Sequence, residues 1–277
     1  MQIKRQEPFA LLKKQPGDSQ VNLSRRMNYL YLAFALAKRD ILARYRRSTI
    51  GFFWAILDPL FHLLIFSVIR QFLGITTGDM PYTIFLISGL VPWNLFIHVV
   101  NNITPSILSN AGVMKKTRVP REVFPLVTVF TGLFDHLMAL MIVLVMMIIY
   151  RAPFTLHLLW LPVLIGLMVA FASGLGMGVA SFGIFRRDII RAGSYIFQLL
   201  FYLSPIFYPI EMVPVSLRKY YLLNPLVGIL NGFRNVLGSG AAPDLLQLAY
   251  ALPVVLLVLL IGWRIYRYRS VYFTDYL

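Results

Sequence analysis

The chain contains no cysteine among its 277 residues, and it has only 11 acidic residues. The absence of cysteine excludes a disulfide framework, a thiolate metal site and a thiol nucleophile. Lysine, arginine, aspartate and glutamate together make up 13% of the residues, whereas they make up about a quarter of an ordinary soluble domain. A soluble domain of this length needs more polar side chains to cover its surface, so soluble enzyme folds are excluded.

The sequence also lacks the short motifs that would indicate catalysis or nucleotide binding. No Gly-Lys dipeptide occurs, so a phosphate-binding loop of the G-x-x-x-x-G-K-[ST] type is absent. No G-x-S-x-G nucleophile motif is present, and the histidines show no metal-ligand spacing. We therefore expect that the chain is not an enzyme and has no catalytic residue, cofactor site or metal site.

Apolar side chains, in contrast, make up 58% of the residues and give a mean hydropathy of +0.72. Several apolar runs reach the roughly 20 residues that a helix needs to cross a bilayer. The pattern predicts an all-α integral membrane protein with six transmembrane helices, near residues 52–73, 83–108, 124–150, 157–185, 192–208 and 245–263. The second and fourth runs exceed what a bilayer needs, so we expect each to tilt or to break, near Trp93 and around Gly174, Gly176 and Gly178.

Positive charge dominates the ionisable residues, with 26 lysines and arginines and a formal net charge of +15. In a soluble protein this excess would suggest nucleic acid, but we expect no nucleic-acid partner here. Lysine and arginine near span ends are retained in the cytoplasm, and one predicted side of the membrane carries 21 of the 26 cations. The opposite side carries Arg70, Arg151, Arg218, Lys219 and Arg234. Both terminal tails, residues 1–27 and 264–277, are therefore expected in the cytoplasm.

A basic amphipathic helix is predicted over residues 28–48, ahead of the first span. Its apolar residues share one face and most of its cations share the other, which suits the anionic surface of the cytoplasmic leaflet. Arg44, Arg46 and Arg47 could hold the phosphate groups of a lipid-linked substrate, or they could bind only anionic lipid. Arg44 falls on the apolar side, where it could snorkel or reach toward a cavity.

Ionisable residues inside membrane spans are functional candidates. Asp58 and His62 lie four residues apart in the first predicted span, and Asp135 and His136 lie within the third. They could form a proton relay. The structural interpretation, which we favour, is that Asp58 satisfies backbone groups freed by Pro59 and that the others pair between helices. The sequence assigns no function to these four residues.

Aromatic residues make up 14% of the chain, and many of them lie near predicted span ends. Most fit an interfacial belt. A minority could line a path for a polysaccharide, because sugars stack on aromatic faces through their C–H groups. The candidates for such a path are Phe52, Trp54, Tyr82, Trp93, Phe96, Tyr202, Phe207 and Tyr208.

Residues 209–244, between the fifth and sixth predicted spans, are too apolar for a solvated loop and too interrupted by proline for a full span. Short half-helices that dip back into the membrane fit this pattern. Such irregular backbone survives at membrane depth only against protein or a watery cavity. The segment is therefore a candidate for a gate on the outer side.

Six motifs, in order along the chain, resemble those of the ABC-2-type permeases that export lipid-linked polysaccharides. They are residues 44–60 (RYRRSTIGFFWAILDPL), 88–93 (SGLVPW), 115–121 (KKTRVPR), 185–189 (FRRDI), 204–209 (SPIFYP), and 223–226 (LNPL) with Phe233-Arg234. The resemblance covers residues 30–277, and its motifs fall on the spans predicted from apolar runs alone and on the connections between them.

The resemblance implies a half-transporter in the cytoplasmic (inner) membrane that forms a homodimer and recruits two copies of a separate ATPase subunit. That partner would bind ATP and magnesium, and the transmembrane domain would cover residues 49–263. The loop at 111–122 would dock on the ATPase, with Lys115, Lys116, Arg118, Pro120 and Arg121 as coupling residues. Re-entrant helices within 209–238 would form the outer gate, with Pro209, Pro214, Asn224 and Pro225 as candidate residues.

The implied substrate is a long glycan on a lipid carrier. O-antigen polysaccharide is the favoured substrate, and capsular polysaccharide and teichoic acid are the alternatives. A proton-coupled secondary transporter is a rival class that would use the intramembrane Asp and His residues. A membrane glycosyltransferase would need an essential acid on the outer side, where Asp79 and Glu211 lie. Drug exporters of the same superfamily would differ in substrate rather than in architecture.

Overall fold

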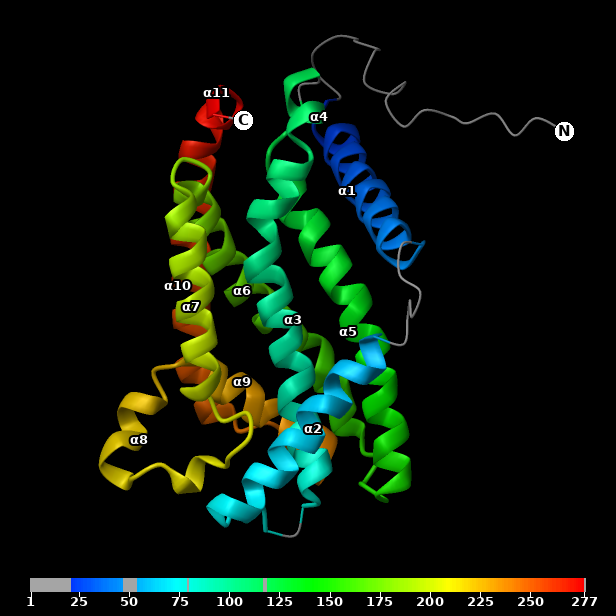
Figure 1. Cartoon of the computed structure of the whole chain (residues 1–277), viewed down its shortest axis with the longest axis vertical. Coiled ribbons are helices and arrows are strands. Elements are labelled where there is room, and N and C mark those ends of the chain that lie inside the picture. Colours follow the sequence, from blue (N-terminus) through cyan, green and yellow to red (C-terminus); the bar gives the residue numbers. More distant parts are fainter. Residues whose placement is uncertain (1–20, 47–53, 79, 117–118, 277) are drawn as a thin grey trace, which may run out of the picture.

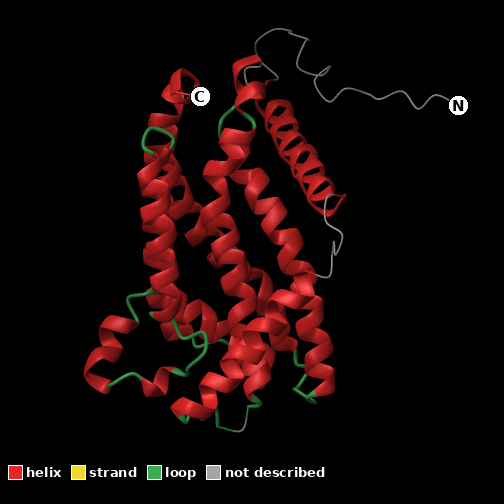
Figure 2. Ribbon diagram, in the orientation of Figure 1, coloured by secondary structure: helices red, strands yellow, loops and turns green. Residues whose placement is uncertain are grey.

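The structure is a computed structural model, and it describes residues 21–46, 54–78, 80–116 and 119–276. These residues form helices joined by short loops and contain no strand (Figure 2), which confirms the all-α prediction. The principal helices are α1 (Val21–Arg46), α2 (Trp54–Leu73), α3 (Tyr82–Ser109), α4 (Ala111–Lys116), α5 (Val123–Ile149), α6 (Leu161–Gly183), α7 (Arg187–Tyr202), α8 (Val215–Tyr221), α9 (Pro225–Arg234), α10 (Leu245–Arg269) and α11 (Phe273–Tyr276). Short helices η3 (Leu156–Trp160), η4 (Ile210–Met212), η5 (Asn235–Ser239) and η6 (Ser270–Tyr272) complete the order.

The six apolar runs of the sequence coincide with α2, α3, α5, α6, α7 and α10. Among the described residues, four segments are long and apolar enough to cross a membrane by length and composition. They are Tyr82–Ser109, Val123–Ile149, Leu156–Gly183 and Leu245–Tyr276. Helix α2 contributes a shorter apolar stretch, Phe61–Leu73, and α7 has 16 residues, three of which are charged.

The long helices run side by side between two ends of the molecule (Figure 1). One end, at the top of Figure 1, holds α4, the α6–α7 connection and the C-terminal helix α11. The opposite end holds α8 and α9 together with the start of α3. The cation-rich connections of the sequence thus gather at a single end of the bundle.

Helix α3 lies at the centre of the bundle and packs against α5, α6 and α9. Its most apolar stretch is 78% buried, against 22% for that of α5 and of α10, whose remaining apolar surface is exposed in the single chain. Neither α3 nor α6 is broken. Pro92 and Pro105 lie inside a continuous α3, because neighbouring helices can compensate the backbone groups that proline frees.

The glycines that suggested a break in α6 instead allow close packing against α10. A Cβ atom on Gly262 of α10 would lie 2.0 Å from the carbonyl oxygen of Gly174 of α6. A Cβ atom on Gly174 would lie 2.7 Å from the carbonyl oxygen of Val258. Small residues let two helix backbones approach in this way, and packing between membrane helices depends on it.

Candidate functional site

Two arginines of α1 fasten this helix to the bundle. Arg44 donates from Nη1 to Oδ2 of Asp135 in the middle of α5. The same carboxylate lies 3.5 Å from Nδ1 of His98 on α3, and Nε2 of His98 is 3.0 Å from the hydroxyl of Thr131. Arg44 was expected to snorkel or to reach toward a cavity, and in the structure it pairs with Asp135 of a neighbouring helix. Asp135 therefore pairs between helices, as the structural interpretation of this residue expected.

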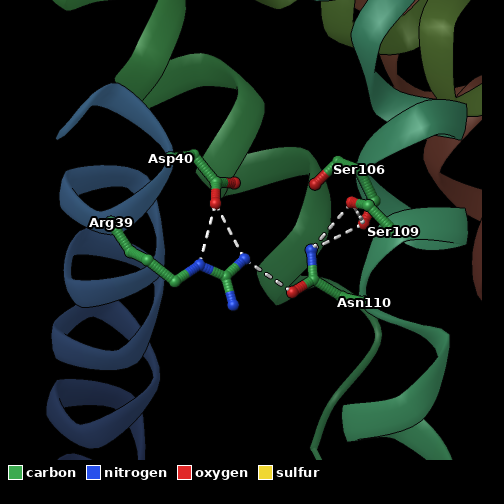
Figure 3. A network of polar contacts seen from close by, with 5 residues as sticks. All are labelled: Arg39, Asp40, Ser106, Ser109 and Asn110. Atoms are coloured by element: carbon green, nitrogen blue, oxygen red, sulfur yellow. Dashed lines mark hydrogen bonds and ion pairs between the residues drawn. The ribbon is translucent and has the colours of Figure 1, made fainter. Parts of the chain in front are cut away.

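The second contact between α1 and the bundle is made by Arg39, five residues before Arg44 (Figure 3). Arg39 donates from Nη2 to Oδ1 of Asn110 at a distance of 2.8 Å, and it also pairs with the adjacent Asp40. Asn110 follows the last residue of α3, and its Nδ2 donates to the carbonyl oxygen of Ser106 at 2.8 Å. The amide of Asn110 therefore links the end of α3 to α1.

The other head-group candidates are placed differently. Arg46 is the last residue of α1 and is exposed, so its charge is available to an anion. Arg47 lies outside the described residues. Arg44, in contrast, forms an ion pair with Asp135.

The Arg44–Asp135 pair predicts a specific coupling between α1 and α5. Arg44→Gln and Asp135→Asn are each expected to lower the free energy of unfolding of the chain in detergent. The loss in the double variant is expected to be about 1–2 kcal/mol smaller than the sum of the two single losses. Each single change removes this ion pair and keeps one of its two charges, whereas the double change removes both charges. Chemical denaturation of the four proteins measures this coupling. Strictly additive losses would contradict the pairing.

The predicted coupling loop includes an exposed lysine and ends in a packed turn. Lys115 is exposed on α4, whereas Pro120 and Arg121 are half-buried. Nη2 of Arg121 donates to the carbonyl oxygen of Val271 at 3.3 Å, and the hydroxyl of Tyr266 donates to the carbonyl oxygen of Arg121 at 2.8 Å. Lys116 ends α4, its side chain is outside the described part, and Arg118 is outside it altogether.

At the opposite end of the bundle, a buried arginine holds the segment that follows α7. Arg234 on α9 is only 6% exposed. Its Nη2 donates to the carbonyl oxygens of Pro205 and Ile206, at 2.7 and 3.3 Å, and its Nη1 donates to Oδ1 of Asn231 at 3.0 Å. The guanidinium carbon lies 3.6 Å from the ring centroid of Phe85 on α3. One side chain thus connects α9, α3 and residues 204–209.

Of the predicted gate residues, Asn224 contacts the segment that Arg234 holds. Asn224 caps α9, because its Oδ1 accepts from the backbone N–H of Leu226 at 3.1 Å, and its Nδ2 donates to the hydroxyl of Ser204 at 3.1 Å. Pro225 begins α9 and is buried. Pro209 precedes η4, and Pro214, which is exposed, precedes α8. The short helices expected between the last two spans are therefore present.

Three of the aromatic path candidates are buried within this single chain. Tyr82 is buried at the start of α3 and donates to the carbonyl oxygen of Phe207 at 3.1 Å. Trp93 and Phe96 pack together with ring centroids 5.1 Å apart, and Phe96 is fully buried against Phe171. In the single subunit these side chains contribute to packing.

The remaining candidates lie nearer the surface. Tyr202 is 61% exposed, and Phe207 and Tyr208 are half-buried. The hydroxyl of Tyr208 lies 2.8 Å from that of Tyr221 on α8, and burial of Tyr221 raises its pKa above the ordinary value of tyrosine. Phe52 lies outside the described residues, and Trp54 begins α2 with a side chain that is not described.

Helix α7 carries two adjacent exposed stripes of different character. Arg191, Tyr195, Gln198 and Tyr202 are exposed, and their spacing of four, three and four residues places them on one face; we call them the polar stripe. Ala192, Ile196 and Leu199 are also exposed and follow the same spacing one residue further on; we call them the apolar stripe. Gly193 and Phe197 lie on the packed face. The helix therefore has one face against protein, one suited to lipid and one suited to a polar phase.

The intramembrane residues without an assigned role are only partly placed. His62 stacks on Phe66 with centroids 6.4 Å apart, and His136 is buried edge-on against Phe233 of α9 at 6.1 Å. The side chain of Asp58 is not described.

Arg234 was not predicted as a site from the sequence, and of the polar stripe of α7 only Tyr202 was among the aromatic path candidates. The signal for Arg234 was a lone cation in an apolar stretch, next to Phe233. The signal for the stripe was a set of polar residues recurring at helical spacing inside a predicted span.

Comparison with known proteins matches residues 31–237 to the ABC-2 type transporter family. The chain is 28% identical over 261 residues to the O-antigen export system permease protein RfbA of Klebsiella pneumoniae, covering 93% of this chain and 99% of that protein. It is 30% identical over 235 residues to the RfbA protein of Myxococcus xanthus, covering 83% and 89% of the two chains. It is 27% identical over 242 residues to the polysialic acid transport protein KpsM of Escherichia coli, covering 85% and 92%. Because the family match extends over well more than half of the sequence, the chain belongs to the ABC-2 type transporter family.

Proposed function

We propose that this chain is the permease subunit of an ATP-driven exporter that moves lipid-linked polysaccharide, with O-antigen as the favoured substrate, across the cytoplasmic membrane. The relatives named as O-antigen export permeases align along nearly the whole chain. The observation in the structure that carries the proposal is the polar stripe of α7, which is exposed on a helix that lies among the apolar helices of the bundle.

The proposed architecture has six membrane crossings, formed by α2, α3, α5, α6, α7 and α10. Both termini lie in the cytoplasm, in agreement with the 21 cations on that side. Helices α8 and α9 form a re-entrant segment at the outer face, where Arg234 holds residues 204–209 against α3. Helix α1 lies at the cytoplasmic interface, and Arg46 and Arg47 bind the phosphate groups of the lipid carrier or of anionic lipid.

The driving force comes from a separate ATPase. The sequence has no phosphate-binding loop, so two copies of a partner subunit bind ATP and magnesium and dock on a homodimer of this chain. The exposed Lys115 lies at the same end of the bundle as the C-terminus, where such a partner can reach it. Its positive charge suits an acidic docking surface.

The polar stripe of α7 lines the glycan path. A polar face at membrane depth must meet protein or water, because lipid tails offer it no hydrogen bonds. A polysaccharide suits this face: tyrosine rings stack on sugar C–H groups, and the amide of Gln198 exchanges hydrogen bonds with sugar hydroxyls. The apolar stripe beside it faces lipid or the second subunit.

The cysteine-free sequence makes this assignment directly testable. Tyr195→Cys and Gln198→Cys are expected to react with a membrane-impermeant maleimide at least about tenfold faster than Ile196→Cys and Leu199→Cys, because only a hydrated thiol ionises and reacts readily. The apolar-stripe variants are matched controls on the same helix at the same depth. Equal rates on both stripes, or disulfide-linked dimers through Gln198→Cys without labelling, would contradict a hydrated path.

Capsular polysaccharide is the second candidate substrate. The relatives named KpsM and CtrC, a polysialic acid transport protein and a capsule polysaccharide export protein, favour it. The polar stripe suits both glycans, so the distinction depends on which lipid-linked glycan accumulates inside cells that lack this chain.

A further inference from the structure

The C-terminal residues pack as part of the bundle rather than as a free tail. Helix α10 continues to Arg269 and is followed by η6 and α11. Tyr266 and Phe273 are fully buried, and their rings meet edge to face with centroids 5.6 Å apart. Buried aromatic side chains contribute strongly to packing, so this end of the chain has a defined position.

The segment contacts the loop before α5 through two reciprocal hydrogen bonds. The hydroxyl of Tyr266 donates to the carbonyl oxygen of Arg121 at 2.8 Å. The side chain of Arg121 donates in return to the carbonyl oxygen of Val271 at 3.3 Å. These bonds fix the backbone directly after Pro120, where the predicted coupling loop turns into α5.

The same segment also contacts the connection between α6 and α7. The ring of Phe185 lies 6.0 Å from that of Phe273 and 4.7 Å from that of Tyr276. The guanidinium carbon of Arg269 lies 4.3 Å from the ring centroid of Phe182 and 5.0 Å from that of Phe185. Phe185 is two residues before the start of α7, so this contact lies directly at the entry of α7 into the bundle.

We propose that residues 266–276, which we call the C-terminal bracket, are a positioning element that makes the loop at 119–122 and the α6–α7 connection move as one unit. The inference rests on the proposed function, in which the first of these segments receives force from the ATPase and α7 lines the glycan path. A displacement of the loop is then transmitted through Tyr266, Phe273 and Phe185 to α7. Contiguous packed side chains can carry such coupling between segments that are distant in sequence.

The alternative is that the bracket contributes only general stability. The two roles differ in which residues lose protection against hydrogen exchange after a small substitution in the bracket. A positioning element loosens both attached segments and leaves the rest of the bundle unchanged, whereas a purely stabilising element alters protection throughout or at its own residues alone.

The first measurement uses hydrogen exchange of the full chain in nanodiscs, without any partner. Tyr266→Phe removes one hydroxyl and keeps the ring, and it is expected to speed exchange about fivefold both at residues 121–124 and at residues 184–187. Tyr268→Phe is the matched control, because Tyr268 lies on the same helix and is 73% exposed. Phe273→Leu is expected to reproduce the paired effect by loosening the ring contacts. Exchange that changes at only one of the two segments, or uniformly along the chain, would overturn the bracket.

The second measurement uses the chain purified with its co-purifying ATPase and reconstituted with lipid-linked polysaccharide extracted from the same cells. Tyr266→Phe is expected to lower the glycan exported per ATP about threefold or more while ATP hydrolysis stays within about twofold of the unaltered complex. Unchanged export per ATP in Tyr266→Phe would also overturn the bracket. If the unaltered complex exports no glycan, the proposed function fails, whereas the exchange experiment still decides whether the two segments are coupled.

Discussion

Replacing Arg234 with leucine is expected to lower the free energy of unfolding by about 3 kcal/mol, because the buried carbonyl oxygens of Pro205 and Ile206 then lose their charged donor. The half-buried amide of Asn231 also loses its hydrogen bond from Arg234. The leucine also cannot reproduce the contact of the guanidinium with the ring of Phe85. Denaturation of the purified chain in detergent measures the loss.

Two further variants separate the network from the charge alone. Arg234→Lys keeps the charge, but its single ammonium lacks the planar fork that reaches both Asn231 and the carbonyl oxygens, so we expect an intermediate loss. Lys219→Leu removes an exposed cation from the neighbouring helix α8 and should change stability by about 0.5 kcal/mol or less. A loss for Arg234→Leu as small as that of Lys219→Leu would contradict the role of Arg234 in holding residues 204–209.

Reversing the charge of Lys115 is expected to reduce export by about tenfold or more, because this exposed cation faces the proposed docking side for the ATPase. Lys115→Arg keeps the charge and should export normally. Co-purification of the ATPase with each variant, together with export from vesicles, measures the effect.

The charge-conserving variant Pro120→Ala addresses coupling without altering membrane orientation. Proline restricts its own backbone and that of Val119, so its removal loosens the loop. We expect ATP hydrolysis to persist while export falls. Normal export from both Lys115→Glu and Pro120→Ala would mean that the cations only retain this loop in the cytoplasm.

Much of the helical architecture was predictable from the sequence, because apolar runs of membrane length leave the backbone few alternatives to a helix. The predicted boundaries of the third span, 124–150, agree with α5 at Val123–Ile149. The position of Arg44 on the apolar side of its helix was visible as well. Its pairing with Asp135 was not, because periodicity places a residue on a face but does not say which helix that face meets.

The aromatic residues illustrate a second limit of the sequence. Phe96 and Tyr202 are both aromatic and both lie in apolar runs, yet the first is fully buried and the second is exposed. Which of the two side chains is buried depends on how each helix packs against its neighbours, and the sequence alone does not give this packing. The C-terminal residues are a related case: a basic tail was predicted, whereas Phe273 is seven residues after Tyr266 and packs on the same side of the bundle.

The most direct test of the central claim is transport by the purified components. The chain and its co-purifying ATPase are reconstituted into vesicles with lipid-linked polysaccharide, and exposure of the glycan on the far side is followed with and without ATP. The account predicts glycan transfer that requires ATP hydrolysis, and no ATP hydrolysis by this chain alone. Transfer driven by a proton gradient in the absence of ATP, or ATP turnover by the isolated chain, would contradict it.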